Sequence, residues 1–326
     1  MTEDFEFKWR KLYGEGIGSV YHSYDWAKAR EVSGDKPIFI KIESGSEMKA
    51  GMVAFEKTKD FLVIGKKKIL FSEGNPLCLE KIYSREILKE FKNKSKGFFY
   101  GSIYPTVMNY EKDIYSDAGF MTVTNNTMLI DLSLSEEELF KNLEKKSARW
   151  GVKFAEKKEL VFELSNKEDL KNFYSIYEST TKAGGFHAEK KEFLEYLRNT
   201  EISKLFVVKS QDKIEAGGLI LIDKCYSCAV LNLAAASESG LRLQAMPFLY
   251  WNIIKYCKNL SLRYFDLGGF DAEAKEGDKT YRINKFKERF GGKVVEQYIS
   301  STNFKYPLFR RIYRYYKNFF KKTKNE

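Results

Sequence analysis

An internal repeat is the feature of this sequence that most constrains its fold. The segments Phe39–Lys41 and Lys49–Val53, joined by a turn, resemble Leu205–Val207 and Glu215–Leu219, at an offset of 166 residues between Ala50 and Ala216. The same offset relates two further pairs of segments: Gly74 with Gly240, and Phe98–Tyr100 with Tyr264–Asp266. Four landmarks at one offset indicate a duplicated α+β unit. A junction between two copies is a common place for a ligand-binding cleft.

The chain has 326 residues, which exceeds one typical core and predicts two domains of about 150 residues. Ser135 and Glu138 form a capping-box pattern that begins a helical stretch with a basic face. We interpret this stretch as the bridge between the copies. The expected domains are therefore residues 1–150 and 151–326, each with a mixed sheet flanked by helices.

Charge and cysteine content restrict the class of protein. The net charge is +11, which favours anionic partners such as phosphates, RNA or a membrane surface, although on composition alone solvated surface lysines are the better explanation. Cys225 and Cys228 are spaced so that a strand would turn them to opposite faces, and the chain has only two histidines, so no metal site is expected. No apolar run reaches the length of a membrane span, so a cytoplasmic protein is expected.

The final residues form a basic and aromatic tail. Between Phe304 and Glu326 there are eight Lys or Arg residues, eight aromatic residues and one Glu. Plotted as a helix, the aromatic and cationic side chains fall on different faces, which suits an anionic membrane surface or an RNA backbone. An ordinary terminal helix packed on the core is the equal alternative.

Four motifs follow one another along the chain: Trp26-Ala27-Lys28, Lys146-x-x-Arg149, Phe265–Gly269, and Phe286-Lys287-x-x-Phe290-Gly291-Gly292. Together they resemble the motifs of the FemABX family, peptidyltransferases that build peptidoglycan cross-bridges. The resemblance spans nearly the whole chain. The chain is most similar to the compact members of the family, which have no coiled-coil arm. It implies an α+β fold of two tandem domains of the GNAT (acyl-CoA N-acyltransferase-like) type.

The resemblance also implies an activity: transfer of an amino acid from aminoacyl-tRNA to a peptide amine of a nucleotide- or lipid-linked cell-wall precursor, without metal or redox cofactor. Two alternatives stay open. One is an N-acyltransferase of the same superfamily that uses an acyl-CoA or acyl-carrier donor. The other is a non-enzymatic protein that binds RNA or a membrane.

The residue types fit direct aminolysis of an activated ester, which needs no nucleophilic side chain. The sequence has no G-x-S-x-G motif and no phosphate-binding P-loop. By the resemblance, Lys287 stabilises the developing oxyanion. Asp266, at the end of a strand, is a second catalytic candidate that would orient the amine. Gly268 and Gly269 would let a ligand approach the backbone closely. Without the motif, Lys287 reads as a surface lysine, Asp266 as a cap, and the glycines as a turn.

The remaining candidates are substrate-binding residues assigned through the resemblance. Lys28, Arg30 and Arg149 would point into the cleft and hold a pyrophosphate. Tyr104 stands where compact members place the Asp of an Asp-Pro pair, and Phe193 stands where they place a Tyr. Glu189 likewise replaces an Arg. These departures concern the acceptor more than the chemistry.

Overall fold

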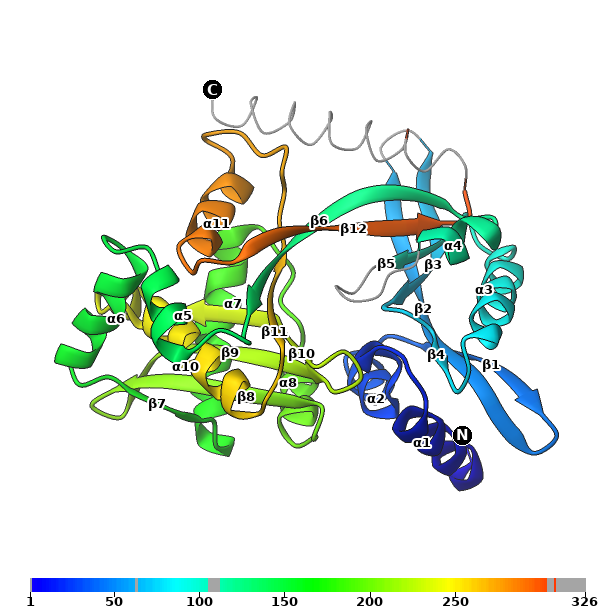
Figure 1. The fold of residues 1–326 in the computed structure, drawn as a ribbon, viewed down its shortest axis with the longest axis horizontal. Helices are drawn as coiled ribbons and strands as arrows, with labels where there is room; N and C mark the ends of the chain where they lie inside the picture. The colour runs from blue at the N-terminus through cyan, green and yellow to red at the C-terminus, as the bar shows by residue number, and fades with distance from the viewer. Residues whose placement is uncertain (1, 62–63, 105–111, 304–307, 309–326) are drawn as a thin grey trace. The chain divides into compact units, whose positions relative to one another are not determined.

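The computed structural model describes residues 2–61, 64–104, 112–303 and 308, which divide into two compact units (Figure 1). Unit 1 consists of Met1–Gly18, Lys36–Thr124 and Gln297–Glu326, and unit 2 consists of Ser19–Asp35 and Asn125–Glu296. The tail that begins at Phe304 was expected to be a basic helix, and apart from residue 308 it lies outside the described residues. Within the described part, no helix has the length and apolar character needed to cross a bilayer.

Unit 1 is a mixed sheet with helices on it. Its strands are β1 (Pro37–Ser44), β2 (Glu47–Phe61), β3 (Gly65–Glu73), β4 (Leu77–Cys78), β5 (Gly101–Tyr104) and the end of β12 (Lys293–Ser301). Its helices are α1 (Glu3–Glu15), α3 (Ile82–Ser95) and α4 (Lys112–Asp117). One core forms where Ile87, Leu88 and Phe91 of α3 pack with Met52 and Leu70 of the sheet.

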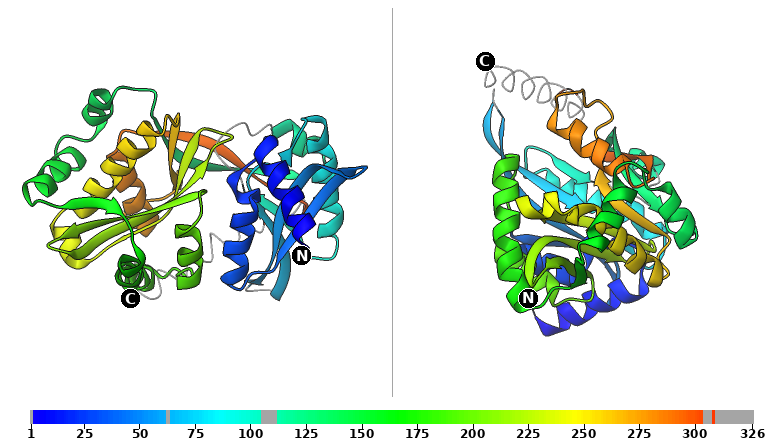
Figure 2. Two further views of the ribbon diagram at one scale, coloured as in Figure 1. Left: turned by 90° about the horizontal axis from the view of Figure 1, so that it is seen from below. Right: turned by 90° about the vertical axis from the view of Figure 1, so that its left-hand side faces the viewer.

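Unit 2 is built in the same way. Its strands are β6 (Met121–Asp131), β7 (Val161–Leu164), β8 (Ser203–Ser210), β9 (Lys213–Asp223), β10 (Cys228–Ala236) and β11 (Tyr264–Gly269). Its helices are the short 3-10 helix η1 (Val20–His22), α2 (Tyr24–Val32), α5 (Glu136–Asn142), α6 (Ala148–Lys157), α7 (Lys167–Gly184), α8 (Lys191–Arg198), α9 (Glu238–Arg242), α10 (Ala245–Asn259) and α11 (Lys279–Glu288). Helix α10, yellow in Figure 2, packs along the yellow-green strands β8 and β9.

Side-chain caps explain where several of these helices begin. The Ser23 side chain accepts a hydrogen bond from the Trp26 N–H, as the sequence predicts for the start of α2. Ser135 and Glu138 form the predicted capping box at α5. Asn166 caps α7 in the same manner. Each cap satisfies backbone N–H groups that the first turn of a helix leaves without a partner.

The structure confirms the duplication. In the β1–β2 hairpin Lys41 lies opposite Gly51, and in the β8–β9 hairpin Val207 lies opposite Gly217, so the registers match at the predicted offset. In each copy the third strand continues antiparallel and the next pairing is parallel, β3 with β5 and β10 with β11. The predicted fold class, two tandem α+β units with mixed sheets, is therefore correct.

The paired glycines have the same packing role in both copies. A Cβ built on Gly51 would lie 2.6 Å from the Trp9 ring of α1, and one built on Gly217 would lie 2.6 Å from the Phe173 ring of α7. Both aromatic rings are fully buried. The absence of a side chain on the second strand thus lets the first helix of each copy lie directly on the sheet.

The boundaries of the two units differ from the expected division at residue 150. The structure separates Thr124 from Asn125, and residues 125–150 belong to unit 2 because Leu139 and Leu143 pack in its core. The last strand of each copy also pairs in the sheet of the other unit. Strand β12, the last of the second copy, pairs with β5 of unit 1, and β6, the last of the first copy, pairs with β11 of unit 2. Residues Ser19–Asp35 belong to unit 2 as well, where the Asp223 carboxylate accepts hydrogen bonds from the Ser19 hydroxyl and the Val20 N–H.

Candidate functional site

The end of β11 and the helix α11 bring the two predicted catalytic residues of unit 2 together. Asp266 lies within β11 and is buried, and Gly268 and Gly269 end the strand. Lys287 lies in the last turn of α11, and although it is a lysine it is only 9% exposed. Burial of a lysine at this level is uncommon unless a specific partner compensates for the lost hydration.

Backbone carbonyl groups supply that partner. The Lys287 Nζ donates hydrogen bonds to the Gly268 carbonyl at 3.0 Å and to the Gly269 carbonyl at 2.8 Å. Gly268 has a φ of +81°, a conformation that favours glycine, and this conformation belongs to the turn that presents the two carbonyls. An ammonium group has three N–H donors, so one donor of Lys287 has no acceptor among the described residues.

The Asp266 carboxylate also holds this turn, through a hydrogen bond from the backbone of the turn. One oxygen of its carboxylate accepts a hydrogen bond from the Gly268 N–H at 2.7 Å and another from the Thr127 hydroxyl. Thr127 comes from β6, the strand that the first copy contributes to this sheet. The sequence analysis did not identify Thr127, because its proximity depends on the pairing of β6 with β11 and no local motif marks it.

Lys287 and Asp266 both have shifted pKa values because both are buried. Burial lowers the pKa of Lys287 to about 8, and the nearby charge of Asp266 opposes that shift. Burial raises the pKa of Asp266 to about 6, while hydrogen bonds from Thr127 and Gly268 and the charge of Lys287 lower it. Near neutral pH Lys287 is therefore mainly an ammonium and Asp266 mainly a carboxylate. Shifted pairs of this kind are typical of functional sites, although structural ion pairs also produce them.

The strand next to β11 is irregular at this position. The parallel pairing of β10 with β11 extends only from Cys228 to Val230 on β10. The register of β10 with β9 then shifts between Leu231 and Leu233, which is a β-bulge. Bulges that end a ladder are frequent next to functional sites. The Leu231 carbonyl is close to this turn, 3.8 Å from a Cβ built on Gly268.

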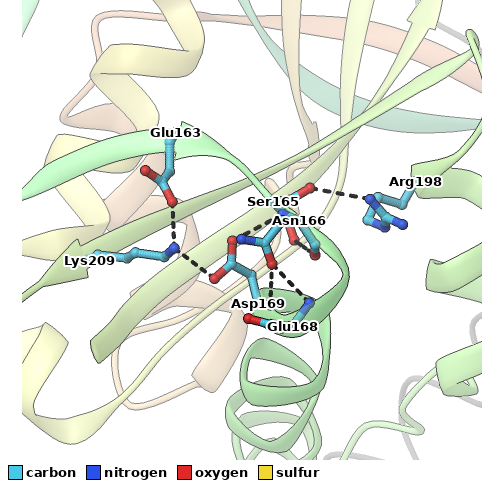
Figure 3. Close-up of polar contacts among 7 residues, drawn as sticks. All are labelled: Glu163, Ser165, Asn166, Glu168, Asp169, Arg198 and Lys209. Atoms are coloured by element: carbon cyan, nitrogen blue, oxygen red, sulfur yellow. Dashed lines mark hydrogen bonds and ion pairs between the residues drawn. The ribbon is translucent and has the colours of Figure 1, made fainter. Parts of the chain in front are cut away.

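A polar cluster around a half-buried lysine in unit 2 shows the contrasting, structural case (Figure 3). Lys209 of β8 lies between two carboxylates, 2.5 Å from Glu163 and 2.7 Å from Asp169. Hydrogen bonds to these carboxylates raise the pKa of Lys209. Asp169 is also part of the cap of α7, so this cluster attaches the start of that helix to the strands β7 and β8.

Arg30 and Phe193, two of the predicted substrate-binding residues, lie together in a packed contact between α2 and α8. The Arg30 guanidinium forms ion pairs with Asp35 and with Glu189, the latter at 2.8 Å. It also lies over the rings of Trp26 and Phe193. Phe193 is fully buried, so it is not available to a substrate in this structure. Two carboxylates already balance the charge of Arg30, which leaves no excess positive charge for a pyrophosphate.

The other predicted residues are placed as follows. Lys28 forms an ion pair with Glu31 at 2.5 Å, and the Arg149 guanidinium donates to the carbonyls of Lys141 and Leu143 at the end of α5. Tyr104, in unit 1, contacts the Phe71 ring and is hydrogen-bonded by Lys59. Within the part of the chain that the structure describes, neither Lys287 nor Asp266 forms a hydrogen bond or ion pair with any of them.

The described residues contain no group of three or more His, Cys, Asp or Glu side chains arranged to hold a metal ion. The cysteines are free, and Cys78, Cys228 and Cys257 are buried while Cys225 is exposed. Burial raises the pKa of Cys257 to about 12, so this thiol stays protonated at neutral pH.

Comparison with known proteins places this arrangement in a known fold. No family model matches the sequence, and no curated protein matches it either. Among solved structures, FemX superposes with a TM-score of 0.71 at 14% identity, covering 94% of this chain and 98% of FemX. The chain has the FemX fold. L-PGS from Bacillus licheniformis gives a TM-score of 0.63 at 15% identity, with 94% and 96% of the two chains covered.

A protein of unknown function from Bacteroides thetaiotaomicron has the same fold, with a TM-score of 0.59 at 12% identity over 91% of this chain and 97% of its own. The full-length coverage confirms that both copies, and the order of elements within them, belong to one FemX-like architecture. At these identities the likeness concerns the fold alone, so the chemistry has to be argued from the residues.

Proposed function

We propose that this protein is an aminoacyltransferase that moves an amino acid from aminoacyl-tRNA to a peptide amine of a cell-wall precursor. The observation that carries the proposal is the buried Lys287 ammonium, which is fixed by two carbonyls and has one N–H donor left over. The FemX fold supports it, and so do the motifs that resemble the FemABX family.

The reaction needs little from the protein beyond positioning and charge stabilisation. The amine nitrogen attacks the carbonyl carbon of the aminoacyl ester, a C–N bond forms, and the carbonyl oxygen becomes an oxyanion. The C–O bond to the ribose then breaks, the amine loses a proton, and the ribose oxygen gains one. No covalent enzyme intermediate and no cofactor are required, because the ester is already activated.

Lys287 is the residue we assign to the oxyanion. Its free N–H donates to the oxygen as negative charge develops, and the surrounding protein has already removed water from the ammonium. Loss of one such donor in other enzymes costs about 3 kcal/mol of transition-state stabilisation. The ammonium is held in place before the substrate arrives, so this stabilisation requires no rearrangement during the reaction.

Asp266 acts in this scheme as a positioning residue. Its carboxylate holds the Gly268 N–H and so fixes the turn whose carbonyls hold Lys287. Its negative charge also keeps the pKa of Lys287 from falling further, which preserves the ammonium at neutral pH. Lys28 and Arg149 stay in the proposal as contacts for the phosphates of the substrates, in the cytoplasm where donor and precursor are both present.

The experiment that tests this function separates the possible donors. The protein is incubated with a pool of aminoacylated tRNA and a cell-wall precursor peptide, and in parallel with acyl-CoA in place of the tRNA. The acceptor is then analysed by mass spectrometry. The proposal expects an amino acid residue added in the first reaction only. An acyl group added only in the second would replace it with the thioester-dependent activity, and no adduct in either would favour a binding protein.

A further inference from the structure

Helix α11 buries two polar side chains against the rest of unit 2. Of its 10 residues, Asn284 and Lys287 are the buried ones, at 6% and 9% exposure. They are three positions apart, so both side chains lie on one face of the helix. A helix usually buries apolar residues on the face that meets the core, yet Phe286 of α11 is only partly buried. The buried face of α11 therefore has a role that apolar packing does not explain.

Asn284 binds the segment that follows the Gly268–Gly269 turn. Its Nδ2 donates a hydrogen bond to the Asp271 carbonyl at 2.7 Å, and its Oδ1 accepts one from the Asp271 N–H at 3.3 Å. The side-chain amide thus satisfies both backbone groups of one residue. Because one of its atoms must donate and the other must accept, only one orientation of the amide forms both hydrogen bonds.

The backbone of residues 268–271 is consequently held at both ends by α11. At the first end Lys287 donates to the carbonyls of Gly268 and Gly269. At the second end Asn284 binds Asp271. Two side chains of one helix thus bind two ends of one short segment. Such a pair of contacts fixes the rotation of the helix as well as its distance from the segment.

The segment is itself attached to the sheet of unit 2. The Phe270 N–H donates to the Asn126 carbonyl of β6 at 2.7 Å, and Gly269 lies opposite Thr127 in the ladder. Hydrogen bonds are directional, whereas apolar burial is not. A helix held to this segment by hydrogen bonds therefore has a defined position, and the Lys287 ammonium in its last turn has one as well.

We propose that Asn284 is a positioning residue that sets the direction of the Lys287 N–H that no carbonyl accepts. The inference rests on the proposed acyl transfer, in which that N–H meets the developing oxyanion. Two carbonyls alone leave the third donor free to swing about the line that joins their oxygens as α11 moves. The second contact, at Asp271, removes that freedom. Misplacement of a reacting group by about 1 Å can cost roughly a hundredfold in rate, so the direction of the donor matters as well as its charge.

A purely structural role for Asn284 is the alternative, since a buried amide that satisfies two backbone groups also stabilises a fold. The two roles differ in their effect on Lys287. If Asn284 acts on stability alone, its loss leaves the ammonium unchanged in every folded molecule. If Asn284 positions α11, its loss lets water reach the ammonium. The pKa of Lys287 then rises from about 8 toward its usual 10.5, because burial is what lowers it.

The test titrates Lys287 directly in the full-length protein. With lysine isotopically labelled at Cε, the NMR signal of Lys287 is the one that Lys287→Met removes. We expect the pKa to rise by about one unit in Asn284→Ala. The rise should be smaller in Asn284→Ser, whose hydroxyl keeps one polar partner for Asp271. In the transfer assay of Asn284→Ala, kcat should fall by roughly ten- to a hundredfold with KM within about twofold, since the oxyanion forms only in the transition state.

Two features keep these results separate from other effects. The charge that acts on the pKa of Lys287 is that of Asp266, and it is the same in all of these variants. Gly217→Ala is the matched control, because its new Cβ meets the Phe173 ring and should destabilise the same unit at a packing site on β9 and α7. It should leave both the pKa of Lys287 and kcat unchanged.

The inference is overturned if the pKa of Lys287 or kcat is the same in Asn284→Ala and in the wild type. It is also overturned if Gly217→Ala changes that pKa equally. The titration needs no substrate. A wild-type protein that transfers no amino acid would therefore refute the proposed reaction, while the titration would still decide whether Asn284 positions Lys287.

Discussion

The half-buried Lys209 and the buried Lys287 illustrate how surroundings decide the role of a residue. Lys209 has two carboxylate partners, and hydrogen bonds to them raise its pKa. Lys287 has two carbonyl partners, and burial lowers its pKa to about 8. The first lysine forms a fully compensated structural contact. The second keeps a spare N–H on a poorly solvated ammonium, which is the arrangement needed to stabilise a new negative charge.

The link between Asp266 and Lys287 predicts a change in pH dependence. The Asp266 charge raises the pKa of Lys287, so Asp266→Asn should lower that pKa below about 8. If the ammonium is the active form, the alkaline fall in kcat should move to lower pH in the variant. The measurement is the pH profile of kcat for both proteins. An alkaline limb at the same pH in both would show that Asp266 does not act through Lys287.

The same substitution should change stability in a defined pH window. The pKa of Asp266 is raised from 3.8 to about 6, so the folded state binds the extra proton between these values. The wild type therefore loses stability as pH rises through this window, by on the order of 3 kcal/mol, and Asp266→Asn removes that loss. Urea unfolding at pH 4 and pH 7 measures it. A stability difference between variant and wild type that is equal at both pH values would contradict the pKa.

At the scale of elements, the sequence predicted the repeat because glycines and strands recur at a fixed offset. It also singled out Lys287 and Asp266, because both lie in short motifs; the structure brings them to one turn, and their catalytic roles stay predictions. It did not predict that β6 completes the sheet of the other copy, since alternation of side chains specifies which face is buried and not which strand is the neighbour. Thr127 was missed for the same reason. The burial of Phe193 and the carboxylates around Arg30 depend on packing between α2 and α8, which no local pattern encodes.

Gly51 and Gly217, the glycines that repeat at the offset of 166 residues, lead to a prediction about stability. Gly217→Ala should destabilise unit 2 by about 1–3 kcal/mol, because the new Cβ would overlap the Phe173 ring. Gly51→Ala should have the same effect in unit 1 through Trp9. Gly218→Ala is the matched control, since its nearest neighbours are at 3.4 Å. Denaturant unfolding measures all three. The packing role is wrong if Gly217→Ala and Gly218→Ala are equally stable.

At the scale of the whole molecule, the exchanged strands make each unit depend on the other copy. Unit 1 contains the end of β12, and the start of that strand belongs to unit 2. Strand β6 passes from unit 1 to unit 2 in the same way. Neither unit is a continuous stretch of chain, so we expect that the two units do not fold separately.

This dependence predicts cooperative unfolding. We expect one calorimetric transition with a van't Hoff enthalpy close to the calorimetric enthalpy, because loss of either sheet removes a strand that the other needs. Fragments 1–150 and 151–326, cut at the division expected from the sequence, should be unstable when expressed alone. Two well-separated transitions, or stable fragments, would show that the exchange of strands β6 and β12 between the copies contributes little to stability.

The most direct test of the central claim is the single-turnover rate of acyl transfer by Lys287→Met. The substitution keeps the length of the side chain and removes the charge and donors, so we expect the rate to fall by about a hundredfold or more. Lys285→Met is the control, because Lys285 lies on the same helix and is exposed and paired with Glu288. The account predicts a near-normal rate for the control and a lost rate for Lys287→Met at unchanged thermal midpoint. A Lys287→Met protein that transfers the amino acid as fast as the control would contradict it.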